Sequence, residues 1–331
     1  MKAMVTGGAG FIGSHVVAQL LDRGDEVVVL DDFSTGTEHN LRAATGTSGD
    51  RLRTYRVDIA DDAAAGIVRR EQPEALLLIA AQSSVKVSMR DPMQDARVNV
   101  IGMLKMLEAA KASGCRKVVF ASSGGTIYGS VDEARLPLRE DYPTAPVSFY
   151  GVTKAAVGHY LAVYRQQAGL DYAALALGNV YGPRQSPYGE AGVVSIFAGT
   201  MLSGRPCVIN GDGLTTRDYV HVTDVARAFV LATGRGTGLM NIGTGIGTAV
   251  NDIYRLLREA LGHDLDPVRG PALPGEVRRV VLDIATARAE LGWEPRIGLK
   301  EGIGTVSDWL RALPPGHPSA PSAATSAAAR G

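Results

Sequence analysis

A tyrosine and a lysine stand one helical turn apart in the segment SFYGVTK, a spacing that suits proton transfer. Residues four apart on a helix share a face, so the ammonium of Lys154 can lie beside the phenol of Tyr150. A free tyrosine, with a pKa of about 10, is rarely ionised near neutral pH. A neighbouring ammonium favours the phenolate and lowers that pKa. The pattern predicts Tyr150 as a general base assisted by Lys154; the alternative is a half-buried tyrosine beside a solvated lysine.

Three hydroxyl side chains precede this pair in the stretch SSGGTIYG, where an apolar run ends. We expect that run to be a strand of a parallel sheet, and ligands of doubly wound sheets bind at the carboxyl ends of the strands. Ser122, Ser123 and Thr126 can therefore relay a proton between a substrate and Tyr150. Each of them can equally be an ordinary cap at the end of a strand.

A glycine-rich turn opens the chain in VTGGAGFIGS, where Gly7, Gly10 and Gly13 follow the first apolar run. Glycines at this spacing permit a tight turn and let the backbone approach a pyrophosphate at the start of a helix. Asp31 ends the next run, where an acid binds a ribose diol, and the adjacent Asp32 competes for that role. Such an acid repels a 2′-phosphate, so the sequence favours NAD over NADP.

The elements that position these residues alternate between apolar runs and segments of helical length. The runs include KAMVTG, EVVVL, ALLLIAA and KVVFASS. Continuous apolar strands separated by helices predict an α/β, Rossmann-like doubly wound parallel sheet. We expect an NAD-binding domain over 1–178, including the catalytic helix, and a smaller α/β lobe over mainly 179–312. The Pro/Ala/Ser-rich segment 313–331 is predicted to be a disordered tail.

Composition excludes several classes of partner. The chain has 34 Lys plus Arg and 34 Asp plus Glu, so it lacks the basic excess typical of nucleic-acid binding. Its two cysteines, Cys115 and Cys207, lie far apart, which favours a reducing compartment and argues against a structural metal. We find neither a signal segment nor an apolar run long enough to span a membrane. We therefore expect a soluble, cytoplasmic protein.

The glycine turn, SSGGTIYG and YGVTK, in this order, resemble the extended short-chain dehydrogenase/reductase family, and the resemblance covers nearly the whole chain up to the tail. The second half is similar to UDP-glucose 4-epimerases and their nucleotide-sugar relatives in NVYGPRQSPYGEAGVVSIF, NGDGLTTRDYVHVTDVARAFV, NIGTG and PGEVRRVVLDI. The resemblance implies an isomerase that uses NAD, whose positive nicotinamide would also favour a phenolate. It further implies a UDP- or dTDP-sugar substrate and a homodimer formed by predicted helices over 93–113 and 148–168.

The resemblance also assigns binding residues. Besides the glycines and Asp31 or Asp32, the residues implied to contact NAD are Phe11, Ile12, Asp58, Ile59, Ala80, Ala81, Gln82, Asn99, Tyr150 and Lys154. Asp58 and Ile59 would lie beside the adenine. The residues implied to contact the sugar nucleotide are Ser83, Ser123, Thr126, Tyr150, Asn179, Gly192, Val193, Arg217, Tyr219 and Glu276.

The catalytic stretch departs from its relatives at one position. Many relatives carry a Ser or Thr where this chain has Gly124, so we assign the third catalytic role to Thr126, with Ser123 second. The related 4,6-dehydratases carry an Asp-Glu pair where this chain has Gly125 and Thr126. Because those two residues cannot act as acid and base near neutral pH, dehydration is disfavoured.

Two further departures lie outside that stretch. Leu273 replaces an Arg common before the Pro-Gly-Glu step, which leaves Arg217 and Arg278 to neutralise a diphosphate. Leu78 stands where many relatives have His, and an apolar strand end there needs only to pack. Arg184, in GPRQ, can meet a carboxylate of the substrate or lie at the surface.

The implied reaction is inversion at C4 of the sugar. Tyr150 would remove the proton of the 4-hydroxyl while the C4 hydride passes to NAD, and the 4-ketose would turn over and be reduced on its opposite face. The leading pair of substrates is UDP-glucose and UDP-galactose. Open alternatives are epimerisation of another UDP- or dTDP-sugar such as UDP-GlcNAc or UDP-glucuronate, a reductase or decarboxylase of the same family, and a non-catalytic sensor of NAD or a nucleotide sugar.

Overall fold

The structure is a computed structural model of the 331-residue chain, and it describes residues 1–42, 49–188, 192–272, 277–314, 317 and 319–320. Its main body is a seven-stranded sheet in the order β10-β6-β5-β4-β1-β2-β3. All neighbouring strands run parallel. The strands are β1 (Lys2–Thr6), β2 (Glu26–Asp31), β3 (Leu52–Arg56), β4 (Ala75–Leu78), β5 (Lys117–Ser123), β6 (Asp171–Leu177) and β10 (Gly238–Ile242). The predicted doubly wound α/β fold is confirmed.

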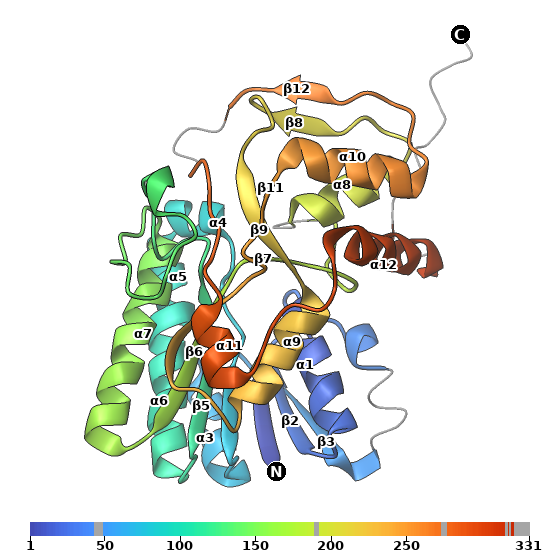
Figure 1. Ribbon diagram of the computed structural model, residues 1–331. Coiled ribbons are helices and arrows are strands. Elements are labelled where there is room, and N and C mark those ends of the chain that lie inside the picture. Colours follow the sequence, from blue (N-terminus) through green and yellow to red (C-terminus); the bar gives the residue numbers. More distant parts are fainter. Residues whose placement is uncertain (43–48, 189–191, 273–276, 315–316, 318, 321–331) are drawn as a thin grey trace.

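Helices cover both faces of this sheet (Figure 1). One layer comprises α1 (Phe11–Asp22), α9 (Val222–Ala232) and α11 (Ala285–Leu291). The other comprises α3 (Asp62–Glu71), α6 (Met103–Ala112) and α7 (Phe149–Ala168). Because both faces are covered, central strands such as β4 are buried along their whole length, as their unbroken apolar sequence requires.

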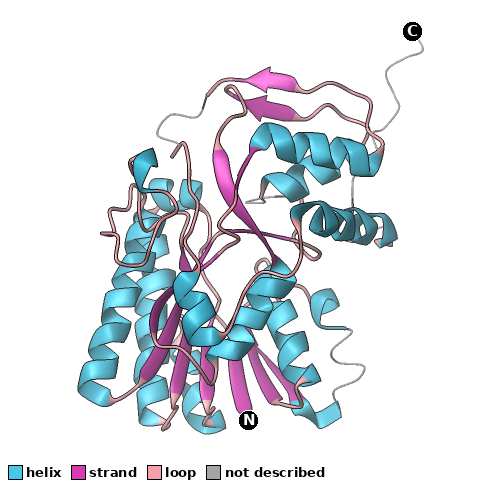
Figure 2. Cartoon of the chain, in the orientation of Figure 1, coloured by secondary structure: helices cyan, strands magenta, loops and turns pink. Residues whose placement is uncertain are grey.

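A second lobe lies beyond the carboxyl ends of the strands (Figure 2). It contains a three-stranded sheet of β7 (Asn179–Tyr181), β9 (Thr216–His221) and β11 (Gly247–Ala249), and a two-stranded sheet of β8 (Val208–Asn210) and β12 (Val268–Gly270). Its helices are α8 (Val193–Leu202), α10 (Val250–Leu261) and α12 (Leu299–Ala312). The lobe has its own apolar core, in which residues of all three helices pack around Tyr181.

The two lobes are not separated cleanly at residue 178. The chain returns from the second lobe to the main sheet, where β10 pairs with β6 and α9 packs against α1. Trp293 is fully buried in the same core and donates its indole hydrogen to the Asp224 carbonyl at 2.8 Å. The first domain is thus completed by residues that the sequence assigned mainly to the substrate lobe.

The predicted helix 93–113 is divided in the structure. A short α4 (Val85–Arg90) precedes α5 (Pro92–Ala96), a π-helical segment η2 (Arg97–Gly102) follows, and α6 continues it. A π segment adds one residue per turn and is common near functional sites. The chain also contains two 3₁₀ turns, η1 (Gly49–Arg51) and η3 (Glu133–Arg135).

Part of the predicted tail is described. His317 packs edge-on against Trp309, with ring centroids 6.3 Å apart, and against His39 at 4.4 Å. The Tyr188 hydroxyl donates to the Ala320 carbonyl at 2.9 Å. Residues 321–331 lie outside the described residues, so their disorder stays a prediction.

Candidate active site

The tyrosine and the lysine lie in the first two turns of α7, whose start is fixed by two serines. Ser148 caps the helix by accepting the backbone hydrogen of Gly151 at 3.1 Å. Ser88 of α4 accepts the backbone hydrogen of Tyr150 itself at 3.1 Å. The start of the catalytic helix is therefore held from its own chain and from a neighbouring helix.

Lys154 lies beneath Tyr150 on the same face of α7, as the spacing predicted. Its side chain is 2% exposed, and Nζ donates to the Ala121 carbonyl at 2.9 Å. The ammonium lies 5.6 Å from the centre of the Tyr150 ring and 4.9 Å from that of Phe120. Burial lowers the pKa of Lys154 to about 8, against the opposing effect of the Asp95 carboxylate. The ammonium therefore stays mostly charged near neutral pH.

The phenol of Tyr150 differs from the expectation of a lowered pKa. Burial raises its pKa above the ordinary value, the Asp95 carboxylate adds to that rise, and a hydrogen bond with Ser123 opposes it. The Lys154 ammonium lies 5.6 Å from the ring centre and donates to the Ala121 carbonyl, and its charge does not outweigh these effects. In the protein alone Tyr150 is a neutral phenol in contact with Ser123.

The hydroxyl of Thr126, to which the sequence assigned the third catalytic role, is buried in the structure. Its Oγ1 is buried and has no hydrogen-bond partner among the described residues. Its carbonyl lies close to α7, since a Cβ on Gly151 would be 2.7 Å from it. A buried hydroxyl without a partner is unfavourable unless a ligand or water completes it. Thr126 thus has a buried hydroxyl without a partner among the described residues, and its catalytic role stays a prediction.

Gly124 lacks a side chain for a packing reason. A Cβ at this position would lie 2.7 Å from Cδ1 of Leu282 and 3.1 Å from the Ala176 carbonyl. Leu282 therefore occupies the space where a Ser or Thr side chain would begin. The neighbouring Gly125 is open by contrast, with Asn179 Oδ1 3.7 Å from its Cβ position.

The glycine turn forms a cradle that side chains would fill. Gly7 has φ +68°, and its Cβ would lie 2.8 Å from the Ala80 nitrogen, while a Cβ on Gly13 would lie 2.0 Å from the Gly7 carbonyl. Gly10 caps α1 without a side-chain hydrogen bond, so amide hydrogens at Phe11 and Ile12 are left without a side-chain acceptor. This arrangement fits the diphosphate of a dinucleotide.

The acids predicted to surround the adenosine are placed at the ends of strands. Asp31 is 5% exposed and accepts the backbone hydrogens of Ala9 and Phe33, both at 2.8 Å, whereas Asp32 is exposed and accepts from Ser34. Burial raises the pKa of Asp31. Asp31 thus also shapes the glycine turn, and which of the two acids meets a ribose stays open.

Asp58 follows β3 and forms an ion pair with Arg97. Its Oδ1 accepts the Ala60 amide hydrogen at 2.9 Å, and its Oδ2 accepts from both terminal nitrogens of Arg97 at 3.0 and 3.1 Å. Ile59 beside it is 3% exposed and belongs to the core under α3 and α6. Any contact of this pair with adenine stays a prediction.

The loop after β4 is tied to η2. Gln82 donates its backbone hydrogen to Asn99 Oδ1 at 3.0 Å, and Asn99 Nδ2 donates to the Gln82 carbonyl at 2.8 Å. Ala80 and Ala81 are half-buried before this junction, and Ala80 lies against the glycine turn. Asn99 therefore fixes the loop that the sequence assigned to the cofactor. Leu78, in the preceding strand, is fully buried, as expected for a strand end that only packs.

The second lobe brings its predicted residues to one small sheet. Asn179 of β7 pairs in register with Tyr219 of β9, and Arg217 lies two residues earlier on the same strand. Tyr219 is 5% exposed and packs against Tyr181, while Arg217 donates to the Thr216 carbonyl at 3.0 Å. Arg278 forms an ion pair with Asp212 at 2.7 Å. Among these residues, Asn179 faces the segment that follows β5, where its Oδ1 lies 3.7 Å from the Cβ position of Gly125.

The remaining predicted residues lie at the start of α8 or in loops. Gly192 caps α8 and Val193 begins it, again without a side-chain cap, which suits an anionic group. Ser83 is exposed. Leu273 and Glu276 lie outside the described residues. Arg184 is half-buried with φ +70°, and its Nη1 is buried without a partner among the described residues, so it is not an ordinary surface residue.

The geometry can be compared with known proteins. A model of the NAD dependent epimerase/dehydratase family matches residues 3–243. The chain belongs to this family.

The proteins similar to this chain include several named UDP-glucose 4-epimerase. The UDP-glucose 4-epimerase of Mycolicibacterium smegmatis is 44% identical over 313 residues, covering 94% of this chain and 99% of that protein. The crystal structure of UDP-glucose 4-epimerase with UDP-glucose from Thermotoga maritima is 43% identical, with a TM-score of 0.89, and covers 94% and 99% of the two chains. The Thermus thermophilus UDP-glucose 4-epimerase in complex with NAD is 44% identical, with a TM-score of 0.86 and the same coverage. NAD is the cofactor of this epimerase-family protein.

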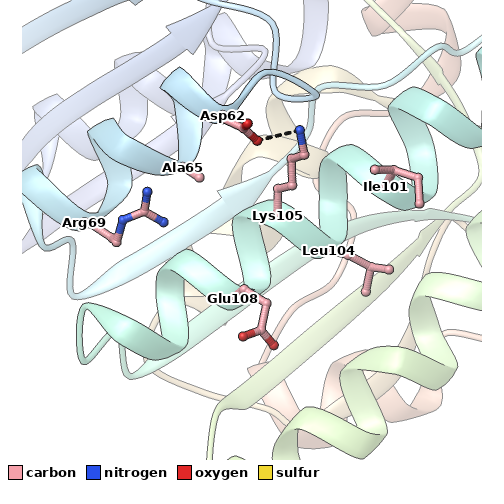
Figure 3. A pocket seen from close by; sticks show the side chains of 7 residues that line it. All are labelled: Asp62, Ala65, Arg69, Ile101, Leu104, Lys105 and Glu108. Atoms are coloured by element: carbon pink, nitrogen blue, oxygen red, sulfur yellow. Dashed lines mark ion pairs between the residues drawn. The ribbon is translucent and has the colours of Figure 1, made fainter.

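Outside this site, the epimerase-family fold carries a pocket of about 330 Å³ between α3 and α6 (Figure 3). Seven residues line it: Asp62, Ala65, Arg69, Ile101, Leu104, Lys105 and Glu108. None of them is a predicted site residue. Asp62 and Lys105 form an ion pair at 2.7 Å, and Glu108 pairs with Lys111 at 2.6 Å. The pocket is a hollow between α3 and α6 that contains paired charges.

Two classes of feature are not found among the described residues. They contain no group of three His, Cys, Asp or Glu side chains that could hold a metal ion. No helix among the described ranges is long and apolar enough to cross a membrane.

Sequence reasoning missed three residues that shape the epimerase-family site. Ser88 and Leu282 act through contacts between distant segments, which no local motif signals. Asp95 lies four residues before Asn99, and this helical spacing was the available signal. Its buried carboxylate contacts both Gln82 and Asn99.

Proposed function

We propose that this protein is a UDP-glucose 4-epimerase that interconverts UDP-glucose and UDP-galactose through transient oxidation at C4. One arrangement carries the proposal. The Tyr150–Lys154 turn and the free hydroxyl of Thr126 lie near the carboxyl end of β5, the glycine cradle follows β1 at the same edge of the sheet, and Asn179 of the second lobe lies next to Gly125. In folds of this type ligands bind at that edge. The similarity to proteins named for this activity supports the choice of sugar nucleotide.

The reaction needs one proton to be moved at the sugar 4-hydroxyl, and we assign that step to Tyr150. Its oxygen, as the phenolate that the Lys154 ammonium and the positive charge of bound NAD would favour, accepts this proton and returns it when the sugar has presented its other face. Ser123, which bonds to the phenol, and Thr126, with its free buried hydroxyl, hold the 4-hydroxyl and pass the proton. When bound, NAD supplies the acceptor and donor of the C4 hydride, so the overall conversion involves no net oxidation.

The charge of Lys154 supports the same step. Its ammonium lies under the Tyr150 ring in a buried setting, where an opposite charge is felt more strongly than in water. It stabilises negative charge that develops on the phenol oxygen. Lys154 also fixes the end of β5 through the Ala121 carbonyl.

The second lobe holds the nucleotide while the sugar turns. The start of α8 at Gly192 and Val193, together with Arg217, binds the diphosphate, and Asn179 contacts the sugar side. Anchoring by a remote group retains an intermediate whose sugar must stay loose. We assign Phe11, Ile12 and the glycine turn to the NAD diphosphate.

We further propose a cytoplasmic homodimer. Both cysteines are free and buried, which suits a reducing compartment. The second copy would cover an apolar face of η2 and α7 on which Ile101, Val152, Tyr160 and Val163 are each between 42% and 55% exposed. A row of apolar side chains of this kind on helices is typical of an interface.

The proposed activity is tested with purified protein and a panel of UDP- and dTDP-sugars, with product identified by chromatography. UDP-galactose should yield UDP-glucose without added oxidant or reductant. Bound NAD is quantified in the same preparation. If NAD is bound and no sugar nucleotide is inverted at C4, the proposed activity is wrong and a sensing role takes its place.

A further inference from the structure

A buried carboxylate that the reaction does not use lies next to the catalytic turn. Asp95 of α5 is fully buried, and three donors surround it. Gln82 Nε2 and Asn99 Nδ2 donate to its Oδ1 at 2.7 and 3.0 Å, and Thr153 Oγ1 lies 2.9 Å from its Oδ2. No Lys, Arg or His of the described chain lies within 4.0 Å of it. A charge buried in this way is costly and is usually retained for a reason.

Thr153 connects this carboxylate to the backbone of the catalytic turn. Its hydroxyl lies 2.9 Å from both the Asp95 carboxylate and the carbonyl of Tyr150. Thr153 also immediately precedes Lys154 in the chain, and it is itself buried. A shift of Asp95 would therefore be transmitted to both members of the pair.

The second connection is electrostatic. The titratable or charged groups that act on the Lys154 ammonium among the described residues are Asp95 on α5 and Tyr150 on its own helix, while β5 offers only the Ala121 carbonyl and the Phe120 ring. Burial alone lowers the pKa of Lys154, and Asp95 opposes that effect. The same carboxylate raises the pKa of Tyr150. Removing the charge of Asp95 would therefore lower the pKa of both Lys154 and Tyr150.

We propose that Asp95 is a positioning residue for the catalytic pair: through Thr153 it holds the backbone that carries Tyr150 and Lys154, and its negative charge acts on both side chains. The proposal rests on the proposed function for its kinetic consequence. Its electrostatic part concerns the protein alone and can be tested without a substrate.

The test compares Asp95→Asn with Asp91→Asn, a matched control that removes an exposed carboxylate capping the same short helix. The titration of Lys154 is followed by carbon NMR of protein with labelled lysine, assigned with Lys154→Met. We expect the midpoint of Lys154 to fall by about one pH unit in Asp95→Asn, the scale of one lost opposite charge. The midpoint should not move in Asp91→Asn.

The kinetic arm measures kcat for epimerisation against pH. The alkaline limit should move to lower pH by the same amount in Asp95→Asn, whereas a merely structural loss would lower kcat at every pH without moving that limit. Thr153→Val keeps the charge and removes the hydroxyl, so kcat should fall at least several-fold with the Lys154 midpoint unchanged. This second variant tests the positioning role if Asp95→Asn does not fold.

The outcomes separate the two proposals. An unmoved Lys154 midpoint in folded Asp95→Asn, or unchanged kcat in Thr153→Val, overturns the role of Asp95 while epimerisation by the unmodified protein stands. A midpoint that falls as expected in a protein that inverts no sugar supports the electrostatic role and contradicts the proposed function.

Discussion

At the scale of single residues, the phenol of Tyr150 carries the proposed chemistry, and Tyr150→Phe isolates it. The substitution removes one oxygen and leaves the ring over Lys154, so binding of NAD and UDP should be nearly unchanged. Turnover should fall by about 100-fold or more, the scale of a lost general base. Steady-state kinetics and the NAD content of the purified protein measure both quantities. Turnover within a few-fold of the unmodified enzyme would show that Tyr150 is structural.

The sequence predicted which side chains meet here but not their electrostatics. The spacing of Tyr150 and Lys154 and the role of Thr126 depend on local patterns, which fold into one helical turn and one strand end. The pKa of Tyr150 is raised by burial and, to a smaller extent, by Asp95, and both effects follow from packing between helices that are separated in the sequence. Local spacing does not contain that information.

At the scale of elements, packing after the end of β5 explains why Gly124 stands where many relatives have Ser or Thr. Gly124→Ser would press its Cβ against Leu282 at 2.7 Å, and overpacking of this kind lowers the free energy of unfolding by about 1–3 kcal/mol. Thermal or denaturant unfolding measures the loss. Gly125→Ser is the matched control, because its Cβ has only Asn179 Oδ1 within contact distance, at 3.7 Å.

Leu282 is the expected cause of that loss. Adding Leu282→Ala to Gly124→Ser should make the two effects strongly non-additive, because residues in contact couple. Equal stability of the two glycine variants, or simple additivity with Leu282→Ala, would contradict this explanation. It would show that a side chain at position 124 is accommodated without a clash with Leu282.

The elements themselves were predictable where the apolar pattern was unbroken. The strands and α7 follow from continuous apolar runs and from a serine cap. The π-helical segment η2 was not predictable, because its sequence has ordinary helical periodicity and the extra residue is accommodated by contacts with the Gln82 loop. The return of β10 to the main sheet likewise depends on tertiary packing.

At the scale of the whole molecule, a histidine joins the two lobes. His15 of α1 donates from Nε2 to the Pro183 carbonyl at 2.9 Å. Burial, with smaller effects of the nearby Arg184 and His221 charges, lowers its pKa from 6.5 to about 4. As the pH falls from about 6.5 to about 4, the unfolded chain therefore binds a proton at His15 that the folded protein does not bind. The free energy of unfolding decreases over that window.

The effect of His15 is measured by comparing the pH dependence of stability in the unmodified protein and in a variant. His15→Gln keeps a donor without a titrating ring, so between pH 6.5 and pH 4 the unmodified protein should lose up to about 3 kcal/mol relative to the variant. His159→Gln, on an exposed face of α7, is the matched control for replacing a histidine. Parallel stability curves for the unmodified protein and His15→Gln would contradict this account.

The proposed dimer is also a property of the whole molecule. Val163→Asp places a charge in the exposed apolar face of α7, where Val163 is 55% exposed, and should convert a dimer into monomers in light scattering. Val208→Asp is the matched control, since Val208 is 54% exposed on β8 of the second lobe. A monomeric unmodified protein, or a dimer that tolerates Val163→Asp, would exclude this interface.

The fate of the hydrogen at C4 tests the central claim most directly. UDP-galactose carrying deuterium at C4 is converted in ordinary water, and the UDP-glucose formed is examined by mass spectrometry and NMR. Because the hydride leaves and returns within one closed site, the product should retain the deuterium at C4 with inverted configuration. Replacement of that deuterium by solvent hydrogen, or recovery of the sugar without inversion, would contradict the account.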